Sequence, residues 1–532
     1  MTFPRVAVVI VTWNRKDAVS AVLGALSRQT APVDRLDVVV VDNASTDGTL
    51  DFLRKTWSPE RVVENPALHA HEPQFQKPGR DGRGGPNTAG FASLTIVHNH
   101  HNHGGCGGFN TGFAYADQVL GAAGIEDLGY VWLVDDDVDL PPDALEQLAR
   151  VGESDTSIGL VGSRTVDFGD RKTTIETTVY LDRKTGRMCD EPPAHHPLAA
   201  AHRSWVSTVG GVRGGSGYTG VREVDVVSAC SMLARWSAVK KVGFWDYRYF
   251  IYCDDADWCL RMAKAGYRVL LNLDAVVYHT PWHHKLTPVR AYYAQRNVLW
   301  MLQKILPLDE LRDITWRWMR SVMKQALVAG LHRKLFQAEI MRRSIADMMQ
   351  GTWGKLLDDG PKAEELIPGL DRIGALRRGA SIAVSCPSAE CVHWADELRV
   401  LTEDWLRGQG RIGDTPTWTY IVRNDVQDPS NQPGLPERVV YSTRLRSKIR
   451  RQLRWLLGGP TALVVFDQAC DFPLLTGGFN VHVDRRQPAK AQIEAAGPRR
   501  TFGFVFRWIR TAARCTRYRS KLQTYVSATR YG

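Results

Sequence analysis

Three acidic residues that follow an apolar run are the part of this sequence best suited to chemistry. The run is Tyr130–Val134, and Asp135, Asp136 and Asp137 come directly after it. Side chains alternate along an extended backbone, so Asp135 and Asp137 are expected on one side and Asp136 on the other. A hard divalent cation such as Mg²⁺ or Mn²⁺ would relieve the repulsion between the carboxylates and would bind phosphate oxygens as well. The alternative is a solvated acidic turn that caps the helix expected at Pro142.

A second acidic group and a later histidine add to this pattern. Asp254 and Asp257 fit the capping pattern of a helix start, and acids in a first turn also favour the helix dipole. Asp255 is a further acid beside aromatic residues, in a place where a general base would deprotonate a hydroxyl. Further along, a strand-like run ends in His279. Its imidazole would complete a metal shell, and the alternative is a buried structural histidine.

Two loops supply weaker signals. Asp42 ends an apolar run, where it would accept hydrogen bonds from a base or a ribose, or would close the strand as an Asx turn. The segment Gly104–Gly108 predicts a glycine-rich turn before a helix, which lets a ligand approach the backbone. The cluster His98–His103 resembles a metal-binding tract, but a solvated loop is the favoured interpretation.

The elements that position these residues alternate between strands and helices. Val6–Val11 and Leu36–Val41 are continuous β-branched runs typical of strands buried in a parallel sheet, and Asp17–Arg28 has helical periodicity. The pattern predicts an α/β fold in residues 1–290, with a mostly parallel sheet and helices on both faces. Residues 59–92 are rich in Pro, Gly and His and are predicted to be an inserted loop.

The remainder of the chain has a different character. Residues 291–375 predict a basic helical segment and linker, and residues 376–532 a smaller C-terminal α/β domain whose role the sequence does not give. The basic helical region and the stretch 444–454 are compatible with peripheral contact with an anionic membrane, and equally with a solvated helix face.

Composition excludes some classes of protein. The 532 residues are 44% hydrophobic and 23% charged, which is typical of a folded protein. The net charge of +11 is compatible with nucleotide phosphates, anionic lipid headgroups or nucleic acid as partners and does not select among them. No run approaches a membrane span, and no signal-peptide pattern is present. Nine scattered cysteines favour a reducing compartment, so a cytoplasmic location is expected. Acidic strand ends oppose a nucleic-acid partner, since without metal they repel phosphate.

Taken in order, these motifs resemble those of inverting family 2 glycosyltransferases with the GT-A fold, over residues 4–300. The resemblance includes Thr12-Trp13-Asn14-Arg15 and the segment that begins at Val41-Asp42-Asn43. Within that family, Asp254–Arg261 and Tyr278–Trp282 are similar to segments of galactofuranosyltransferases that build actinobacterial cell-wall galactan. Asn102–Phe109 and Tyr293–Asn297 also resemble their corresponding segments.

The resemblance implies a role for each matched residue. Asp135, Asp137 and His279 would bind a divalent cation, Mn²⁺ or Mg²⁺, and Asp255 would be the catalytic base, with Asp254 orienting the acceptor. The residues expected to contact the nucleotide sugar are Thr12, Asn14, Arg15, Asp42, Asn43, Gly107, Gly108, Asn110, Asp135 and Asp136. The residues expected to contact the acceptor are Trp258, Trp282 and His283.

The implied reaction is transfer of galactofuranose from UDP-galactofuranose to a glycan or a lipid-linked glycan. Rhamnosyltransferases that use dTDP-rhamnose share much of the pattern and are the first alternative. A nucleotide-sugar-binding protein without catalysis is the second, and a nucleotidyltransferase also uses paired acids and a metal. The oligomeric state, the acceptor and the linkage are left open by the sequence.

Overall fold

The structure is a computed structural model that divides into two compact units. Unit 1 comprises Met1–Thr315, Gln350–Lys355 and Leu522–Gly532, and unit 2 comprises Trp316–Met349 and Leu356–Lys521. The residues that the structure describes are 3–76, 89–121, 128–209, 218–281, 287–331, 334–356, 360–424, 426, 436–441, 459–466, 477–483, 487–496 and 498–522.

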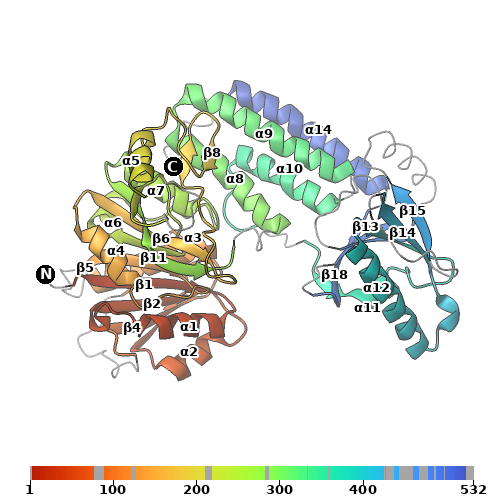
Figure 1. The fold of residues 1–532 in the computed structure, drawn as a ribbon, viewed down its shortest axis with the longest axis horizontal. Coiled ribbons are helices and arrows are strands. Elements are labelled where there is room, and N and C mark those ends of the chain that lie inside the picture. Colours follow the sequence, from red (N-terminus) through yellow and green to blue (C-terminus); the bar gives the residue numbers. More distant parts are fainter. Residues whose placement is uncertain are drawn as a thin grey trace. The chain divides into compact units, whose positions relative to one another are not determined.

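The centre of unit 1 is a nine-stranded sheet with the order β3-β4-β2-β1-β5-β10-β6-β11-β9 (Figure 1). Its strands are β1 (Arg5–Thr12), β2 (Leu36–Asp42), β3 (Arg61–Asn65), β4 (Ser93–Asn99), β5 (Leu128–Asp135), β6 (Ile158–Asp167), β9 (Val221–Glu223), β10 (Ser231–Arg235) and β11 (Arg268–His279). Strand β10 is antiparallel to its neighbours β5 and β6, and β9 is antiparallel to β11, while the other pairs are parallel. The carboxyl ends of the parallel strands on each side of β10 therefore meet at one edge of the sheet.

Helices cover both faces of this sheet because the buried strands are apolar on both sides. Val8 and Ile10 of β1 belong to the same core as Leu23 and Leu145 of two helices on one face. Their neighbour Val9 lies against Gly112 of a third helix on the other face. The helices of unit 1 are α1 (Lys16–Leu26), α2 (Thr49–Trp57), α3 (Gly104–Tyr115), α4 (Ala144–Glu153), α5 (Ala199–Val209), α6 (Trp236–Val242), α7 (Asp254–Lys264) and α8 (Pro288–Ile305).

The predicted α/β fold class is confirmed, and two local expectations are corrected. The interval 59–92, predicted as an inserted loop, contains strand β3, which extends the sheet by pairing in parallel with β4. Residues 77–88 of that interval lie outside the described residues. The glycines of Gly104–Gly108 do not form a turn ahead of a helix but are the first residues of α3. Within this turn of helix, Gly108 allows the backbone of α3 to pack closely on Val11 of β1.

Unit 2 contains a second sheet, with the order β12-β18-β17-β16-β13-β14-β15. Its elements are α10 (Leu335–Gln350), β12 (Ala363–Glu365), α11 (Leu366–Arg372), β13 (Ser381–Cys386), α12 (Ala389–Gly408), β14 (Thr417–Arg423), β15 (Glu437–Tyr441), β16 (Ala462–Phe466), β17 (Phe479–Val483), β18 (Lys490–Ala495) and α14 (Pro498–Ser520). Helix α9 (Leu308–Leu331) begins in unit 1 and continues into unit 2. The division into units thus falls within the helical segment predicted at 291–375.

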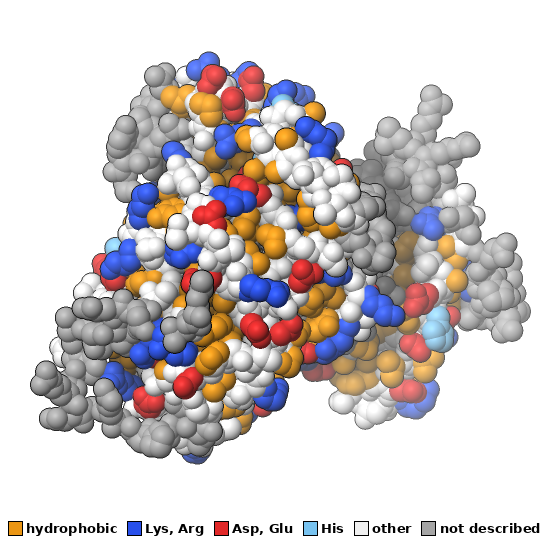
Figure 2. All heavy atoms as spheres, turned by 60° about the vertical axis from the view of Figure 1, so that its left-hand side comes forward, with side chains coloured by type: hydrophobic (Ala, Val, Ile, Leu, Met, Phe, Trp, Pro, Cys, Tyr) orange, Lys and Arg blue, Asp and Glu red, His pale blue; other side chains and the backbone are white. Residues whose placement is uncertain are grey.

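Three general features of the described residues are the distribution of surface charge, the character of the helices and the state of the cysteines. On the face turned forward in Figure 2, basic and acidic side chains are interspersed, without a large field of one sign. Among the helices that the structure describes, none combines the length and apolar character needed to cross a membrane. The eight cysteines in the described residues are all free thiols.

Candidate functional site

Two carboxylates and an imidazole meet at the carboxyl edge of the first sheet. His279 Nε2 lies 3.3 Å from Asp137 Oδ1 and 3.8 Å from Asp135 Oδ2. The ligand atoms of the three residues all lie within 4.8 Å of one another. Backbone hydrogen bonds in both directions between Asp139 and Tyr278, each 3.0 Å long, hold the end of β11 against the turn that follows β5. The residues predicted as metal ligands are therefore close together in the structure.

Asp136 points the other way, as the alternation of an extended backbone requires. Its carboxylate accepts a 2.8 Å hydrogen bond from Thr12 Oγ1 and a 2.9 Å bond from Arg15. The same guanidinium lies 2.7 Å from Asp137. Burial raises the pKa of Asp136 to about 6, against the opposing effect of Arg15. Three residues that were expected to contact the donor, Thr12, Arg15 and Asp136, thus contact one another and hold the turn that contains Asp137.

Asp254 and Asp255 begin α7 and lie close to the same cluster. Burial raises the pKa of the Asp255 carboxyl to about 6, and the charges of Glu176 and Asp135 act in the same direction. Burial and the neighbouring Asp255 also raise the pKa of Asp254. Ala256 donates a 2.7 Å backbone hydrogen bond to Asp255. A carboxylate in this setting is a stronger base than an exposed one, which fits the role expected of Asp255.

The backbone just before α7 has an unusual conformation. Phe250, Tyr252 and Cys253 all have positive φ angles, of 70°, 68° and 64°. Residues other than glycine adopt such angles only when surrounding structure holds them there. Other residues must therefore hold this strained loop in place. The loop ends at Cys253, next to Asp254.

Arg296 and Asn297 on α8, both fully buried, form a clamp that holds this loop through its backbone carbonyls. The amide nitrogen of Asn297 donates to the carbonyls of Tyr249, Ile251 and Tyr252, at 3.1, 2.8 and 2.9 Å. Arg296 donates to the Tyr249 carbonyl at 3.0 Å and to Asn297 Oδ1 at 2.9 Å. In the sequence, Arg296 and Asn297 were noted only as part of Tyr293–Asn297, a segment similar to one in galactofuranosyltransferases. Their spacing does not reveal that they hold a loop more than forty positions away.

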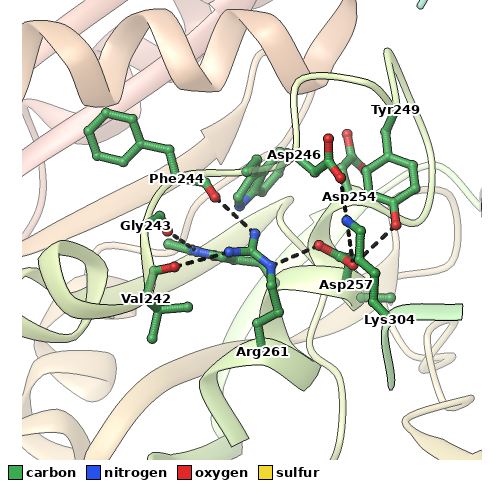
Figure 3. A network of polar contacts seen from close by, with 12 residues as sticks. Val242, Gly243, Phe244, Asp246, Tyr249, Asp254, Asp257, Arg261 and Lys304 are labelled. Carbon is green, nitrogen blue, oxygen red and sulfur yellow. Dashed lines mark hydrogen bonds and ion pairs between the residues drawn. The ribbon is translucent and has the colours of Figure 1, made fainter. Parts of the chain in front are cut away.

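Asp257, the third acid of α7, has a structural role (Figure 3). It is fully buried and accepts hydrogen bonds from Tyr249 at 3.1 Å and Arg261 at 2.9 Å, with Lys304 at 3.0 Å. Arg261 also donates to the Phe244 carbonyl at 2.9 Å. Asp257 therefore ties α7 to the preceding loop and to α8, and its charge is balanced within the protein.

Trp258 does not lie where an acceptor sugar would contact it. Its side chain is fully buried, its ring stacks 5.5 Å from Phe113, and its indole donates 2.9 Å to the Gly243 carbonyl. The expectation that Trp258 contacts the acceptor is wrong, because the helical period places it on the inner face of α7. Trp282 and His283, the other two residues expected there, lie outside the described residues.

Asp42 and Asn43 occupy the end of β2. Asp42 is fully buried and lies 2.7 Å from His98 Nδ1, with a weaker contact of 3.3 Å from the Ser45 amide. His98 is the penultimate residue of β4, so it does not belong to a solvated loop. Asn43 donates to the Gly104 carbonyl at 2.9 Å and accepts from the His103 amide at 3.1 Å. Asn43 thus holds the start of α3, and the Asp42 carboxylate, expected at the base, lies against His98 with no exposed surface.

The other residues expected at the donor also pack within the protein. A Cβ on Gly108 would lie 2.4 Å from Val11 Cγ1, and a Cβ on Gly107 would lie 2.5 Å from the Cβ of His103. Asn110 holds the backbone of Trp245 through two hydrogen bonds of 2.9 and 3.0 Å. These glycines allow α3 to approach its neighbours closely. Asn14, with a φ of 55°, accepts from the Thr46 amide at 2.7 Å and links the ends of β1 and β2.

The donor atoms fit a divalent cation. Asp135 and Asp137 provide the oxygens that Mg²⁺ and Mn²⁺ prefer, and His279 provides a nitrogen. A second group, Glu176, Cys230 and His279, has its ligand atoms equally close together. Burial raises the pKa of the Cys230 thiol well above its usual value, which disfavours the thiolate that a metal needs. The aspartate pair with His279 is therefore the better candidate.

Sequence comparison finds similarity to known proteins in the N-terminal half of the chain. Residues 7–67 and 89–207 match the family model described as Glycosyl transferase family 2. The undecaprenyl-phosphate mannosyltransferase of Micrococcus luteus is 38% identical over 87 residues, which are 16% of this chain and 31% of that protein. The chain thus spans about a third of the length of the curated relative it matches.

Two solved structures are similar to parts of this chain at low sequence identity. The crystal structure of S. aureus TarS is 15% identical and aligns with 65% of this chain and 49% of its own length, with a TM-score of 0.38. The mannosyltransferase PcManGT from Pyrobaculum calidifontis, in complex with GDP-Man and Mn²⁺, is 16% identical over 77% of this chain and 86% of its own, with a TM-score of 0.35.

The family match covers β1, β2, β4 and β5 together with Asp135 and Asp137, and it ends before α7 and His279. The candidate site therefore combines a matched part with a part that the tertiary structure adds. These matched segments, which lie within unit 1, are similar to glycosyl transferase family 2.

Proposed function

We propose that this protein is a metal-dependent, inverting glycosyltransferase that uses a nucleotide-sugar donor. The observation that carries the proposal is the meeting of Asp135, Asp137 and His279 at one edge of the sheet, close to the buried carboxyl of Asp255. Partial burial of several carboxylates together costs free energy unless a cation, with a diphosphate bound to it, balances their charge. A binding protein without catalysis would have little use for a base at residue 255.

The chemistry follows from what each side chain can do. Asp255 accepts the proton of the acceptor hydroxyl as that oxygen forms its bond to the anomeric carbon. The bond from the anomeric carbon to the diphosphate oxygen breaks in the same step, so the configuration inverts and no enzyme-bound sugar is needed. Asp135, Asp137 and His279 would hold a divalent cation, which when bound neutralises the charge that develops on the departing diphosphate. Arg15 keeps Asp136 and Asp137 in place for that task.

The donor is proposed to be UDP-galactofuranose, on the resemblance of Asp254–Arg261 and Tyr278–Trp282 to galactofuranosyltransferases. The acceptor would be a glycan or a lipid-linked glycan. A rhamnosyltransferase that uses dTDP-rhamnose is the second candidate, because it shares the same acidic motifs.

The test is a donor panel with a matched pair of variants. Purified full-length protein is given UDP-galactofuranose, dTDP-rhamnose, UDP-glucose and GDP-mannose with Mn²⁺, and release of the nucleoside diphosphate is measured. We expect turnover with one donor and its loss when EDTA removes the metal. Asp255→Asn should reduce turnover by roughly a hundredfold or more, since general-base catalysis contributes that much.

Two further observations make the test decisive. Asp309→Asn changes an exposed acid on α9 in the same way and should retain full turnover. Nucleotide binding by Asp255→Asn, followed by calorimetry, should remain, because the base contacts the acceptor and not the nucleotide. Normal turnover in Asp255→Asn, or turnover that EDTA leaves unchanged, would refute the proposed mechanism. Release of pyrophosphate instead of a nucleoside diphosphate would indicate a nucleotidyltransferase.

A further inference from the structure

Helix α14 presents an apolar stripe to solvent. Phe502, Phe506 and Ile509 are 75%, 60% and 54% exposed. Their spacing of four and three residues places all three on one side of the helix. Single exposed apolar side chains are ordinary on protein surfaces, but three large ones in a row along one helix indicate a contact surface.

The opposite side of the same helix is fully used within unit 2. Phe504 is buried among Ala326, Ala329, Leu335 and Ala338, and Gly330 allows its ring to approach α9. The indole of Trp508 donates to the Met323 carbonyl at 2.7 Å. Helices α9 and α14 accordingly lie side by side (Figure 1). The stripe is therefore a second apolar face, which exists in addition to the one that the fold requires.

Arginines border this stripe. Helix α14 contains seven arginines and no acidic residue. Arg507 forms an ion pair with Glu339 of α10, at 3.3 Å. The exposed side chains of Arg510, Arg514 and Arg517 make no ion pair with any residue that the structure describes. Spaced by four and three residues, these three lie along one flank of the stripe.

The guanidinium of Arg510 lies 5.0 Å from the centre of the Phe506 ring. An arginine in this position can extend its charged group outward while its methylenes and the ring remain in an apolar layer. Apolar side chains beside such arginines are the pattern of helices that lie in the interface of a bilayer.

We propose that the stripe of Phe502, Phe506 and Ile509 inserts into the surface of an anionic lipid bilayer, with Arg510, Arg514 and Arg517 contacting the lipid phosphates. Charge complementarity selects this partner: the arginines require negative charge, and the stripe requires an apolar layer. A second copy of the chain would bring two arginine-rich helices together, where they repel. A nucleic acid would neutralise the arginines but would leave Ile509 without an apolar environment. This surface is independent of the sugar chemistry proposed for unit 1.

The proposal is tested by flotation of the full-length protein with vesicles. One set contains phosphatidylcholine alone, and the other contains phosphatidylcholine mixed with phosphatidylglycerol. We expect flotation with the anionic vesicles only, weakened by added salt. A triple variant, Phe502→Ser/Phe506→Ser/Ile509→Ser, should bind these vesicles roughly tenfold more weakly or worse, because it loses the inserted apolar area.

The charge of the surface has its own variant. Arg510→Gln/Arg514→Gln/Arg517→Gln should weaken binding by about a hundredfold, since each arginine near an anionic surface contributes about fivefold. Matched controls remove exposed groups elsewhere in unit 2: Val400→Ser/Leu401→Ser on α12, and Arg377→Gln/Arg378→Gln. Circular dichroism and melting curves check that each variant is folded, and the controls should float as well as the unaltered protein.

Several outcomes would overturn the proposal. Absence of flotation of the unaltered protein, equal flotation with both kinds of vesicle, or equal losses in the variants and the controls would each do so. If the protein forms dimers that the serine triple variant dissociates, without any binding to vesicles, the stripe is an interface between copies. If the arginines are needed for binding duplex DNA and vesicles are not bound, the partner is a nucleic acid.

Discussion

At the scale of single residues, burial and charge decide what each acid in the site can do. Asp136 and Asp255 are both buried enough for their pKa values to rise to about 6. Asp136 is held by Thr12 and Arg15, so its charge supports a turn of the backbone. Asp255 begins a helix near the candidate metal ligands, and it is the acid proposed to take a proton. Similar pKa values thus accompany different roles.

The raised pKa of Asp255 predicts the pH dependence of turnover. The ionised form is the base, so kcat/KM should rise with pH, reach half its maximum near pH 6 and then level off. Turnover of the preferred donor measured from about pH 5 to pH 8 tests this limb.

Because the pKa of Asp136 is also about 6, the same profile must be recorded for Asp136→Asn. The acidic limb should persist in that variant at lower overall activity. A kcat/KM that does not change with pH, or a limb that disappears with Asp136, would contradict the assignment to Asp255.

At the scale of elements, glycines set the distance between α3 and the sheet. Gly108 and Gly112 face Val11 and Val9 of β1, and a Cβ at either position would overlap a valine methyl group. A Cβ on Gly105, in the first turn of the same helix, would have nothing within 4 Å. The same residue type therefore has a packing role at two positions and none at the third.

This difference predicts opposite effects of one substitution. Gly108→Ala should lower the free energy of unfolding by about 1–3 kcal/mol, because overpacking forces α3 away from β1. Gly105→Ala should leave it unchanged or raise it by about 0.5–1 kcal/mol, since alanine favours a helix. Urea unfolding of both variants, followed by circular dichroism, measures the two values. Equal effects of the two substitutions would show that the contact with Val11 is unimportant.

The clamp on α8 is the second device at this scale. Asn297 holds three carbonyls of the strained loop that ends at Asp254, so we expect it to position Asp255 through that loop. It contacts no expected ligand group itself, which makes it a positioning residue.

Asn297→Leu should therefore reduce kcat by roughly tenfold or more with little change in the KM for the donor, since a small displacement of a reacting group has effects of this size. Steady-state kinetics measure the split, and Ala294→Ser, one turn earlier on α8, is the control. Amide exchange should also become faster at residues 249–255 in the Asn297 variant alone. A lower melting temperature with unchanged kcat would assign Asn297 a purely structural role.

At the scale of the whole molecule, the described residues of the candidate site all belong to unit 1, whereas the arginine-rich stripe of α14 belongs to unit 2. The chemistry and the proposed lipid contact are thus assigned to different compact units, each with its own sheet.

Donor binding should therefore protect one unit and not the other. UDP with Mn²⁺, at about a hundredfold its Kd, should add about 2.7 kcal/mol to the stability of the unit that binds it. Hydrogen exchange should slow at β5 and α7 and stay unchanged at β13 and β16. Equal slowing in both sheets, or none in the first, would contradict the assignment of the site to unit 1.

The sequence by itself determined the class of fold and the local order of its acidic motifs. Continuous β-branched runs such as Val6–Val11 are typical of strands buried on both faces of a parallel sheet that helices cover. The alternation of side chains in a strand was enough to separate Asp136 from Asp135 and Asp137. These inferences succeed because they depend on neighbours in the chain.

The tertiary structure alone decided which distant residues meet. It brought His279 to the acids after β5 and placed Arg296 and Asn297 against the loop before α7. It also buried Trp258, which the motif Asp254–Arg261 had suggested as a contact of the acceptor. It also placed Gly107 and Gly108, expected in a turn before a helix, within α3, where Gly108 packs on Val11 of β1. The physical reason is that these contacts are non-local: their free energy depends on the register of strands and the crossing of helices, which local spacing does not encode.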